Sequence, residues 1–266
     1  MLRTDLAIES KKDDQNYEKS EYKKGDITVC EIENREEKYI TVSFDDLMRI
    51  SDYGEIEKEV KNQIKALLPK EFEKIMVIGL GNREITPDSI GPSTAERLLA
   101  TRHIAGEFAE KIGLSGLKSI SVISPGVLGK TGVETGEITE GLVKKIMPDA
   151  LIAIDALAAG SIKRVFRTVQ ITNTGISPGS GVKNSRKELS FKTLGVPVIA
   201  VGVPTVMTAQ NLAFELCNKE PKEGEDFIVT PKDSDLLCHR ISEILSKSIN
   251  EALQPKIEPE ILSALV

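Results

Sequence analysis

Cysteine, histidine and tryptophan are scarce in this sequence of 266 residues, which contains three, two and none of them. Cys30, Cys217 and Cys238 lie far apart and form no Cys-x-x-Cys pair, so neither a disulfide framework nor a thiolate zinc site is indicated. His103 and His239 have no second histidine or cysteine at the spacing of metal ligands. We therefore interpret the thiols as small buried side chains and both histidines as structural.

Long apolar runs and excess positive charge are also missing. No stretch reaches the roughly 18 apolar residues that a membrane span requires, and residues 1–15 lack the apolar segment of a secretory signal. The net charge is −6 and the pI is near 5.3, which disfavours direct binding to nucleic acid. We expect a cytoplasmic protein that has neither a membrane nor a nucleic acid as its direct partner.

The composition is that of a soluble globular protein, with 40% hydrophobic and 29% charged residues. The chain is strongly charged up to Lys24. Beyond that point, residues 27–32 and 39–44 alternate between apolar and polar and predict two strands. Apolar residues recur three and four apart in 56–68, which predicts a helix with one buried face. These elements form a small N-terminal β/α extension to one main domain.

From residue 74 onward, short apolar runs alternate with helical segments. Such runs predict a parallel sheet with both faces covered, because each strand buries both of its sides. The clearest helix is the last, for which Thr230 and Pro231 are the expected start. We predict an α/β fold with a mainly parallel, twisted sheet covered by helices on both faces. The predicted strands of this sheet are residues 75–80, 120–123, 150–154 and 196–201.

Two aspartates follow strands of the predicted sheet, at the edge where ligands bind to parallel α/β sheets. Asp155 comes directly after the apolar run 150–154, in a setting that disfavours its ionised form. Asp88 lies in the loop that leaves the strand ending near Leu80. Two carboxyl groups brought together can share a proton, so that one activates water while the other donates to a carbonyl oxygen. This pair is the minimum that metal-free amide hydrolysis requires.

Structural interpretations of the same residues stay open at this point. Asp88 follows Pro87 and precedes a helix, where aspartate is a common cap or turn residue. Asp155 follows a predicted buried strand, where an acidic side chain usually has either an interaction partner or a functional role. Arg186 lies in a basic segment that suits a solvated loop and, beside a crevice, could hold an acidic substrate residue.

Two glycine motifs match known sites poorly. Residues 79–81 begin like a dinucleotide fingerprint, but Glu84 occupies the third glycine position. Residues 175–179 fit the nucleophile elbow around Ser177, yet Pro178 has no N–H where an oxyanion hole needs a donor. Neither a Rossmann site nor a serine hydrolase is therefore indicated.

Several long strings extend over most of the chain. They are RTDLAIE at residues 3–9, GLGN, TPDSIGP and TRH within 77–103, PGVLGKTGVET within 124–137, IAIDALAAGSI, ISPGSGVKNSRKELS and LGVPVIAVGVPTV within 148–206, and the segment 229–253. Together they resemble the germination proteases, which degrade small acid-soluble spore proteins. Gap-free strings of this length are far more specific than the short motifs above.

The resemblance implies an atypical aspartic endopeptidase that uses no cofactor and no metal. Its paired catalytic aspartates fall in the TPD and AID strings, hence on Asp88 and Asp155. Arg186, Ser177 and Gly179 are the candidate substrate-binding residues. The family is made as a zymogen in the developing spore, acts on spore proteins in the spore core at germination, and assembles as a tetramer.

The same resemblance divides the chain into a propeptide at 1–5, an N-terminal extension at 6–73 and an α/β peptidase core at 74–266. The family core is similar to that of the hydrogenase-maturation endopeptidases. Two other functions stay open on the residues alone. One is a metal-dependent processing endopeptidase of that hydrogenase-maturation type, and the other is a non-enzymatic protein that binds a small ligand in its glycine-rich loops.

The N-terminus contains a candidate self-cleavage site. The family cuts its substrates after an acidic residue and before an apolar residue, an alanine, a variable position and a glutamate, and residues 5–9 reproduce that order. The resemblance therefore places the processing bond between Asp5 and Leu6. A short charged terminus is expected to be loosely held and so able to reach a crevice. Compared with better-known members, the chain has a shorter leader and a shorter stretch between Val206 and Val229.

Overall fold

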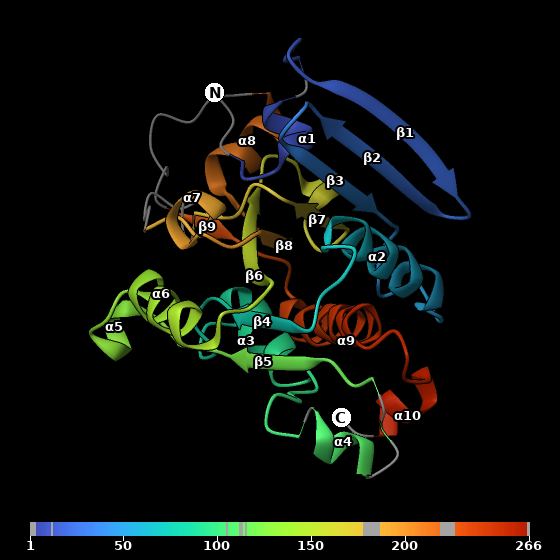
Figure 1. The fold of residues 1–266 in the computed structure, drawn as a ribbon. Helices are drawn as coiled ribbons and strands as arrows, with labels where there is room; N and C mark the ends of the chain where they lie inside the picture. The colour runs from blue at the N-terminus through green and yellow to red at the C-terminus, as the bar shows by residue number, and fades with distance from the viewer. Residues whose placement is uncertain are drawn as a thin grey trace.

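One continuous sheet organises the computed structural model, with helices on both of its faces (Figure 1). No helix among the described residues is both long enough and apolar enough to cross a membrane. The described residues are 4–11, 13–104, 106–111, 114, 116–177, 187–218 and 227–264.

The strands run in the spatial order β1-β2-β3-β7-β8-β6-β4-β5, and β9 pairs with β8. The pairs β8–β6, β6–β4 and β4–β5 are parallel, while the other pairs are antiparallel. The N-terminal strands therefore extend the same sheet as the parallel core. The bounds are β1 Glu18–Lys24, β2 Ile27–Glu33, β3 Lys38–Ser43, β4 Lys74–Gly79, β5 Ser119–Ile123, β6 Ala150–Ala159, β7 Thr168–Thr172, β8 Val198–Thr208 and β9 Ile228–Val229.

The helices connect these strands, and the longest of them is α9 near the C-terminus. Their bounds are α1 Ala7–Ser10, α2 Gly54–Leu67, η1 Thr86–Asp88, α3 Ile90–Ala95, α4 Glu107–Lys111, α5 Leu128–Thr131, α6 Thr135–Ile146, η2 Ile162–Arg164, α7 Phe191–Leu194, α8 Ala209–Cys217, α9 Ser234–Leu253 and α10 Pro259–Ala264.

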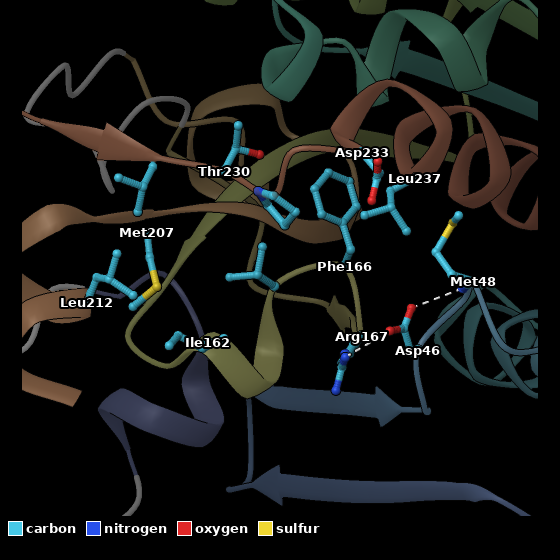
Figure 2. Close-up of a pocket in the computed structure, with 13 residues that line it drawn as sticks. Asp46, Met48, Ile162, Phe166, Arg167, Met207, Leu212, Thr230, Asp233 and Leu237 are labelled. Carbon is cyan, nitrogen blue, oxygen red and sulfur yellow. Dashed lines mark hydrogen bonds and ion pairs between the residues drawn. The ribbon is translucent and has the colours of Figure 1, made fainter. Parts of the chain in front are cut away.

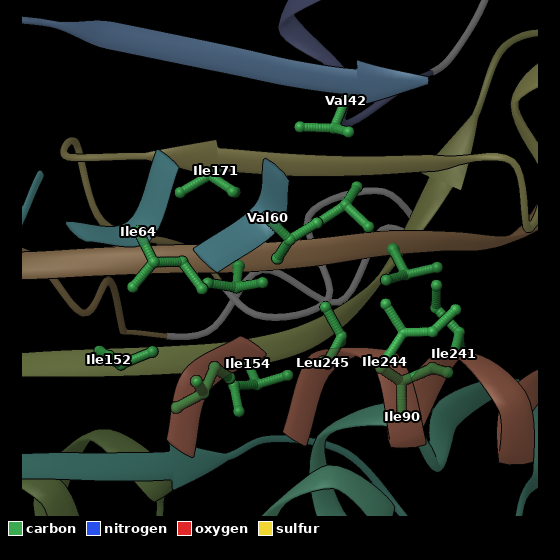
Figure 3. Packing of buried hydrophobic residues seen from close by; sticks show 14 of the residues in the cluster. Val42, Val60, Ile64, Ile90, Ile152, Ile154, Ile171, Ile241, Ile244 and Leu245 are labelled. Carbon is green, nitrogen blue, oxygen red and sulfur yellow. The ribbon is translucent and has the colours of Figure 1, made fainter. Parts of the chain in front are cut away.

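The two faces of β6 bury alternate residues in two separate clusters. Ile152 and Ile154 face the larger cluster, in which α2, α3 and α9 cover the sheet (Figure 3). Leu151 and Ala153 face the smaller cluster, which includes Val143 of α6. This alternation is the period of a strand, and each fully buried aliphatic side chain contributes about 1.5–3 kcal/mol. The prediction of an α/β sheet covered on both faces is confirmed.

Several predicted boundaries differ from the structure. All six predicted strands are present, but β6 and β8 run several residues beyond their predicted ends, and β1, β7 and β9 were not predicted. The last helix starts at Ser234 rather than at Pro231, because residues 231–234 form a turn closed by a bond from Ser234 N to Pro231 O. Thr230 does not cap that helix, since its hydroxyl donates to the carbonyl of Thr205 at 2.8 Å.

A backbone-to-backbone contact fixes α3 against the carboxyl ends of β4 and β6. A Cβ added to Gly91 would lie 2.2 Å from the carbonyl oxygen of Leu80 and 2.6 Å from that of Ile154. A Cβ added to Gly79 would lie 2.3 Å from the carbonyl oxygen of Gly91. Only glycine permits this approach, and α3 directly follows the turn that carries Asp88.

Replacing Gly91 by alanine should destabilise the fold. The added methyl group meets backbone atoms that no side-chain rotation can move, so we expect Gly91→Ala to lower the free energy of unfolding by about 1–3 kcal/mol or more. Gly141 in α6 is the control, because an added Cβ there meets nothing within 4 Å and alanine favours the helix. Denaturant unfolding followed by circular dichroism measures both changes, and a Gly91→Ala midpoint equal to the wild-type midpoint would contradict the contact.

Candidate functional site

Asp155 lies on β6, where the parallel partner β4 has just ended. β4 pairs with β6 as far as Ile154, whereas β8 stays paired with β6 beyond Asp155. The Asp155 side chain is 5% exposed, and its Oδ1 accepts a hydrogen bond from Ala156 N at 2.9 Å. Its register partner on β8 is Gly202, which presents no side chain beside the carboxyl group.

Asp88 is the last residue of η1, in the loop that leaves β4. Its Oδ2 accepts a hydrogen bond from Asn82 N at 2.7 Å. The loop closes tightly because Gly81 has a φ of +112°, and a Cβ there would lie 2.1 Å from the carbonyl oxygen of Asp88. A carboxylate that accepts a backbone N–H is favoured in its ionised form.

The short helix η1 is attached to the sheet and to α9. The hydroxyl of Thr205 on β8 donates to Pro87 O at 2.7 Å, and the thiol of Cys238 on α9 donates to Thr86 O at 3.1 Å. η1 also contacts β6 itself. Asp88 thus follows the carboxyl end of β4, as predicted, whereas Asp155 lies inside β6, one residue past the last pair with β4.

A cavity of about 390 Å³ opens on the sheet face that carries Asp155. Its walls include Gly202 on β8, Gln170 on β7 and Leu157 on β6. Ser177 also lines this cavity, so one of the three predicted substrate-binding residues is beside it. The other two, Gly179 and Arg186, lie outside the described residues.

Gly202 is required by the way β6 and β8 pack on this face. A Cβ added there would lie 2.4 Å from Leu157 Cδ1, so Leu157 of β6 packs directly over the Gly202 backbone. A glycine inside a strand commonly marks such a close approach. Gly202 lies within the apolar run 196–206, so the sequence alone could have indicated this close approach.

The N-terminal segment is held against the site, contrary to the expectation of a loosely held terminus. Asp5 N donates to Ala158 O at 2.9 Å, and Ala158 N donates to Asp5 Oδ2 at 2.8 Å. Glu9 Oε2 accepts from Gly160 N at 2.7 Å, and Leu6 is fully buried. The carboxylates of this charged segment satisfy backbone groups at the end of β6, which is why the segment does not fray.

The Asp5–Leu6 bond does not lie at Asp155 in this arrangement. Asp5 pairs with Ala158, which is three residues farther along the chain and therefore about 10 Å away at 3.3 Å per residue. Thr4 and Asp5 line the same cavity as Gly202 and Gln170. The segment thus occupies one end of the cavity beside the aspartates.

Both histidines are surface groups. His103 is exposed, and His239 on α9 lies between Arg97 and Glu243, with His239 Nδ1 3.0 Å from Arg97 Nη2 and His239 Nε2 3.3 Å from Glu243 Oε1. Within the part of the chain that the structure describes, no group of three or more His, Cys, Asp or Glu residues is arranged to hold a metal.

A second cavity, of about 380 Å³, was not predicted from the sequence (Figure 2). Its walls are mainly apolar and come from separate elements, including Phe166, Met207 of β8, Leu212 of α8 and Leu237 of α9. No local sequence pattern connects these elements. This cavity shares no lining residue with the first, and neither Asp88 nor Asp155 lines either of them.

A protein-family model described as germination protease matches residues 5–218. The chain belongs to the germination protease family. The matched range covers both aspartates, β6, β8 and most of the held N-terminal segment. The chain is accordingly a peptidase with protein substrates, as the resemblance implied.

Germination proteases of several spore formers are similar over most of their length. The protein from Clostridium tetani is 38% identical over 326 aligned positions, which cover 99% of this chain and 98% of the relative. The protein from Clostridium acetobutylicum is 37% identical, with coverages of 97% and 96%, and that from Bacillus mycoides is 38% identical, with coverages of 84% and 70%. An alignment of 326 positions is longer than this chain, so that germination protease has segments that this chain lacks.

Among solved structures, the chain is similar to the [NiFe] hydrogenase maturation protease HycI from Thermococcus kodakarensis. The TM-score is 0.42 and the sequence identity is 16%, with 72% of this chain and 99% of that chain covered.

The thiol behind η1 should be unreactive at neutral pH. Burial raises the pKa of the Cys238 thiol to about 11, so it stays protonated and a poor nucleophile. Cys217 at the end of α8 is exposed and serves as the internal control. Iodoacetamide at pH 7 should label Cys217, spare Cys238 and leave peptidase activity unchanged, as peptide mapping by mass spectrometry can show. Rapid labelling of Cys238 with loss of activity would indicate a thiol in the chemistry.

Proposed function

We propose that this chain is an aspartic-type endopeptidase that begins the degradation of small acid-soluble spore proteins during germination. The observation that carries the proposal is that Asp88 follows the carboxyl end of β4 while Asp155 lies on the neighbouring parallel strand β6, one residue past the last pair with β4. Membership of the germination protease family supports the substrate class and the timing.

In the proposed reaction the two carboxyl groups share one proton. The ionised aspartate takes a proton from water as the water oxygen attacks the carbonyl carbon of the substrate. The protonated aspartate donates to the carbonyl oxygen, which gains negative charge as the tetrahedral intermediate forms. The intermediate then collapses and the C–N bond breaks. The proton taken from water passes to the leaving nitrogen, and the proton on the former carbonyl oxygen returns to the aspartate that donated it.

The position of Asp155 suits this chemistry. Its carboxyl group is almost completely buried and is preceded by the apolar strand Ala150–Ile154. Electrostatic interactions are stronger in such surroundings than in water. The cavity lined by Gly202, the register partner of Asp155 on β8, provides room for a peptide on the same face of the sheet.

We further propose that the chain is a zymogen that processes itself between Asp5 and Leu6. In the described arrangement that bond lies beside Ala158, about 10 Å along β6 from Asp155. Processing therefore requires the segment to leave its contacts with β6, or to enter the crevice of a neighbouring copy. The tetramer and the location in the developing spore and the spore core belong to the same proposal and rest on resemblance to the family.

Asp88→Asn and Asp155→Asn should each abolish turnover without unfolding the chain. Each change removes one ionisable partner while nearly preserving side-chain volume, so we expect kcat to fall by about 10²–10⁴-fold or more. The measurement is cleavage of a purified small acid-soluble spore protein, with circular dichroism as the check on folding. Asp26→Asn is the matched control, because Asp26 is an exposed turn residue, and it should retain full turnover. Near wild-type kcat in either folded site variant would exclude the dyad.

Self-processing should produce a new N-terminus at Leu6. Intact-mass analysis of wild-type protein held at mildly acidic pH should show the loss of residues 1–5, because a dyad that shares one proton requires a protonated carboxyl group. Asp155→Asn protein should stay uncut alone. Mixing it with wild-type protein distinguishes the two routes: the variant will be cut in the mixture if a neighbouring copy cleaves the segment, and it will stay uncut if each chain cleaves only itself. A fully active wild-type enzyme that still begins at Met1 would show that residues 1–5 are not a propeptide.

A further inference from the structure

The side chain of Gln170 binds the main chain of the N-terminal segment at two points. Its Nε2 donates to Asp5 O at 3.2 Å, and its Oε1 accepts from Ala7 N at 2.6 Å. The two bonds lie on either side of Leu6, one to the C=O of the Asp5–Leu6 peptide unit and the other to the N–H of the Leu6–Ala7 unit. Both are made to backbone groups around Leu6, an extended residue directly before α1, so the contact recognises the main chain rather than a particular side chain.

A glutamine side chain is unexpected at this buried position of β7. Its side chain is 7% exposed in a strand whose other residues include the buried Val169 and Ile171. A buried amide without partners would cost about 1–3 kcal/mol. When the N-terminal segment leaves, both atoms of the amide lose these partners, and a substrate main chain can replace them.

Gln170 also lies in line with the candidate catalytic residue Asp155. Asp155 on β6 is the register partner of Gly202 on β8, and Gly202 is in turn the register partner of Gln170 on β7. Two strand spacings of about 4.8 Å separate the two residues by about 10 Å, which is the length of three extended residues. The cavity beside Gly202 lies along this path.

We propose that Gln170 is a main-chain anchor for the substrate peptide, and that residues 4–7 occupy the same anchor in the arrangement described above. This inference rests on the proposed peptidase function and adds a residue to it. The bond to be cut then lies about three residues from the position that Gln170 holds. The N-terminal segment and a substrate exclude one another, because both need the same amide.

The test is a scan of backbone N-methylation in a peptide with the sequence of residues 3–11. Binding is measured by calorimetry to the Asp155→Asn chain, in which the peptide is not cut and must displace the chain's own N-terminal segment. Within one chain this competition is the same for every peptide, so the ratio of affinities with and without N-methylation does not depend on it. At one position, N-methylation should weaken binding by about fivefold to tenfold, because it removes the N–H group that donates a hydrogen bond to Gln170 Oε1. In the Asp155→Asn/Gln170→Met chain, which preserves the side-chain volume, the same methylation should cost less than about twofold. If Gln170 had only a structural role, N-methylation at that position would weaken binding equally in both chains. That result would overturn the proposal that Gln170 anchors the substrate.

Two further variants keep the outcome interpretable. Gln170→Glu retains an acceptor and should keep the position-specific penalty, which guards against a folding defect in the methionine variant. Thr172→Val is the matched control, since Thr172 lines the same cavity two residues along β7, and it should also keep the penalty. Failure of the wild-type enzyme to hydrolyse the unmodified peptide would count against the proposed function, whereas loss of the Gln170-dependent penalty alone would count against the anchor.

Discussion

The contact between Gly79 and Gly91 is the constraint on which the site depends. It lets the backbone of α3 touch the ends of β4 and β6, where any side chain at either position would meet backbone atoms. The turn before α3 carries Asp88, so this approach brings Asp88 to the edge where β6 continues past β4 with Asp155. Bonds from Thr205 and Cys238 then fix η1 from the two other sides. A rigid backbone contact is a suitable support for a pair whose chemistry depends on distance.

Much of this arrangement could be predicted from local patterns. The run Ala150–Ile154 and the acid after it indicated a buried strand that ends at a polar residue. The buried strand is present, but β6 continues to Ala159, so Asp155 lies inside it. β1 gave no such signal, because Glu18–Lys24 is charged and almost wholly exposed and is recognisable only by its pairing with β2. The docking of Asp5 on Ala158 joins residues far apart in the chain, so no local pattern could reveal it.

The held N-terminal segment changes how the site is understood. From the sequence, residues 1–5 are a short charged terminus, and general experience favours fraying. In the structure, Asp5 and Glu9 accept backbone N–H groups at the end of β6, and Gln170 binds the main chain between them. The substrate-like string at residues 5–9 therefore lies beside the aspartates without reaching them. In the proposed function, substrate binding and self-processing both then depend on releasing one set of hydrogen bonds.

The central claim is that Asp88 and Asp155 hydrolyse a peptide bond with no metal ion. The most direct measurement is cleavage of a small acid-soluble spore protein by enzyme treated with a strong chelator, with the residual metal content determined on the same sample. The account predicts turnover equal to that of untreated enzyme at a metal content far below one ion per chain. Loss of turnover on chelation, followed by recovery when a divalent metal is added back, would contradict it and would favour a metal-dependent processing protease.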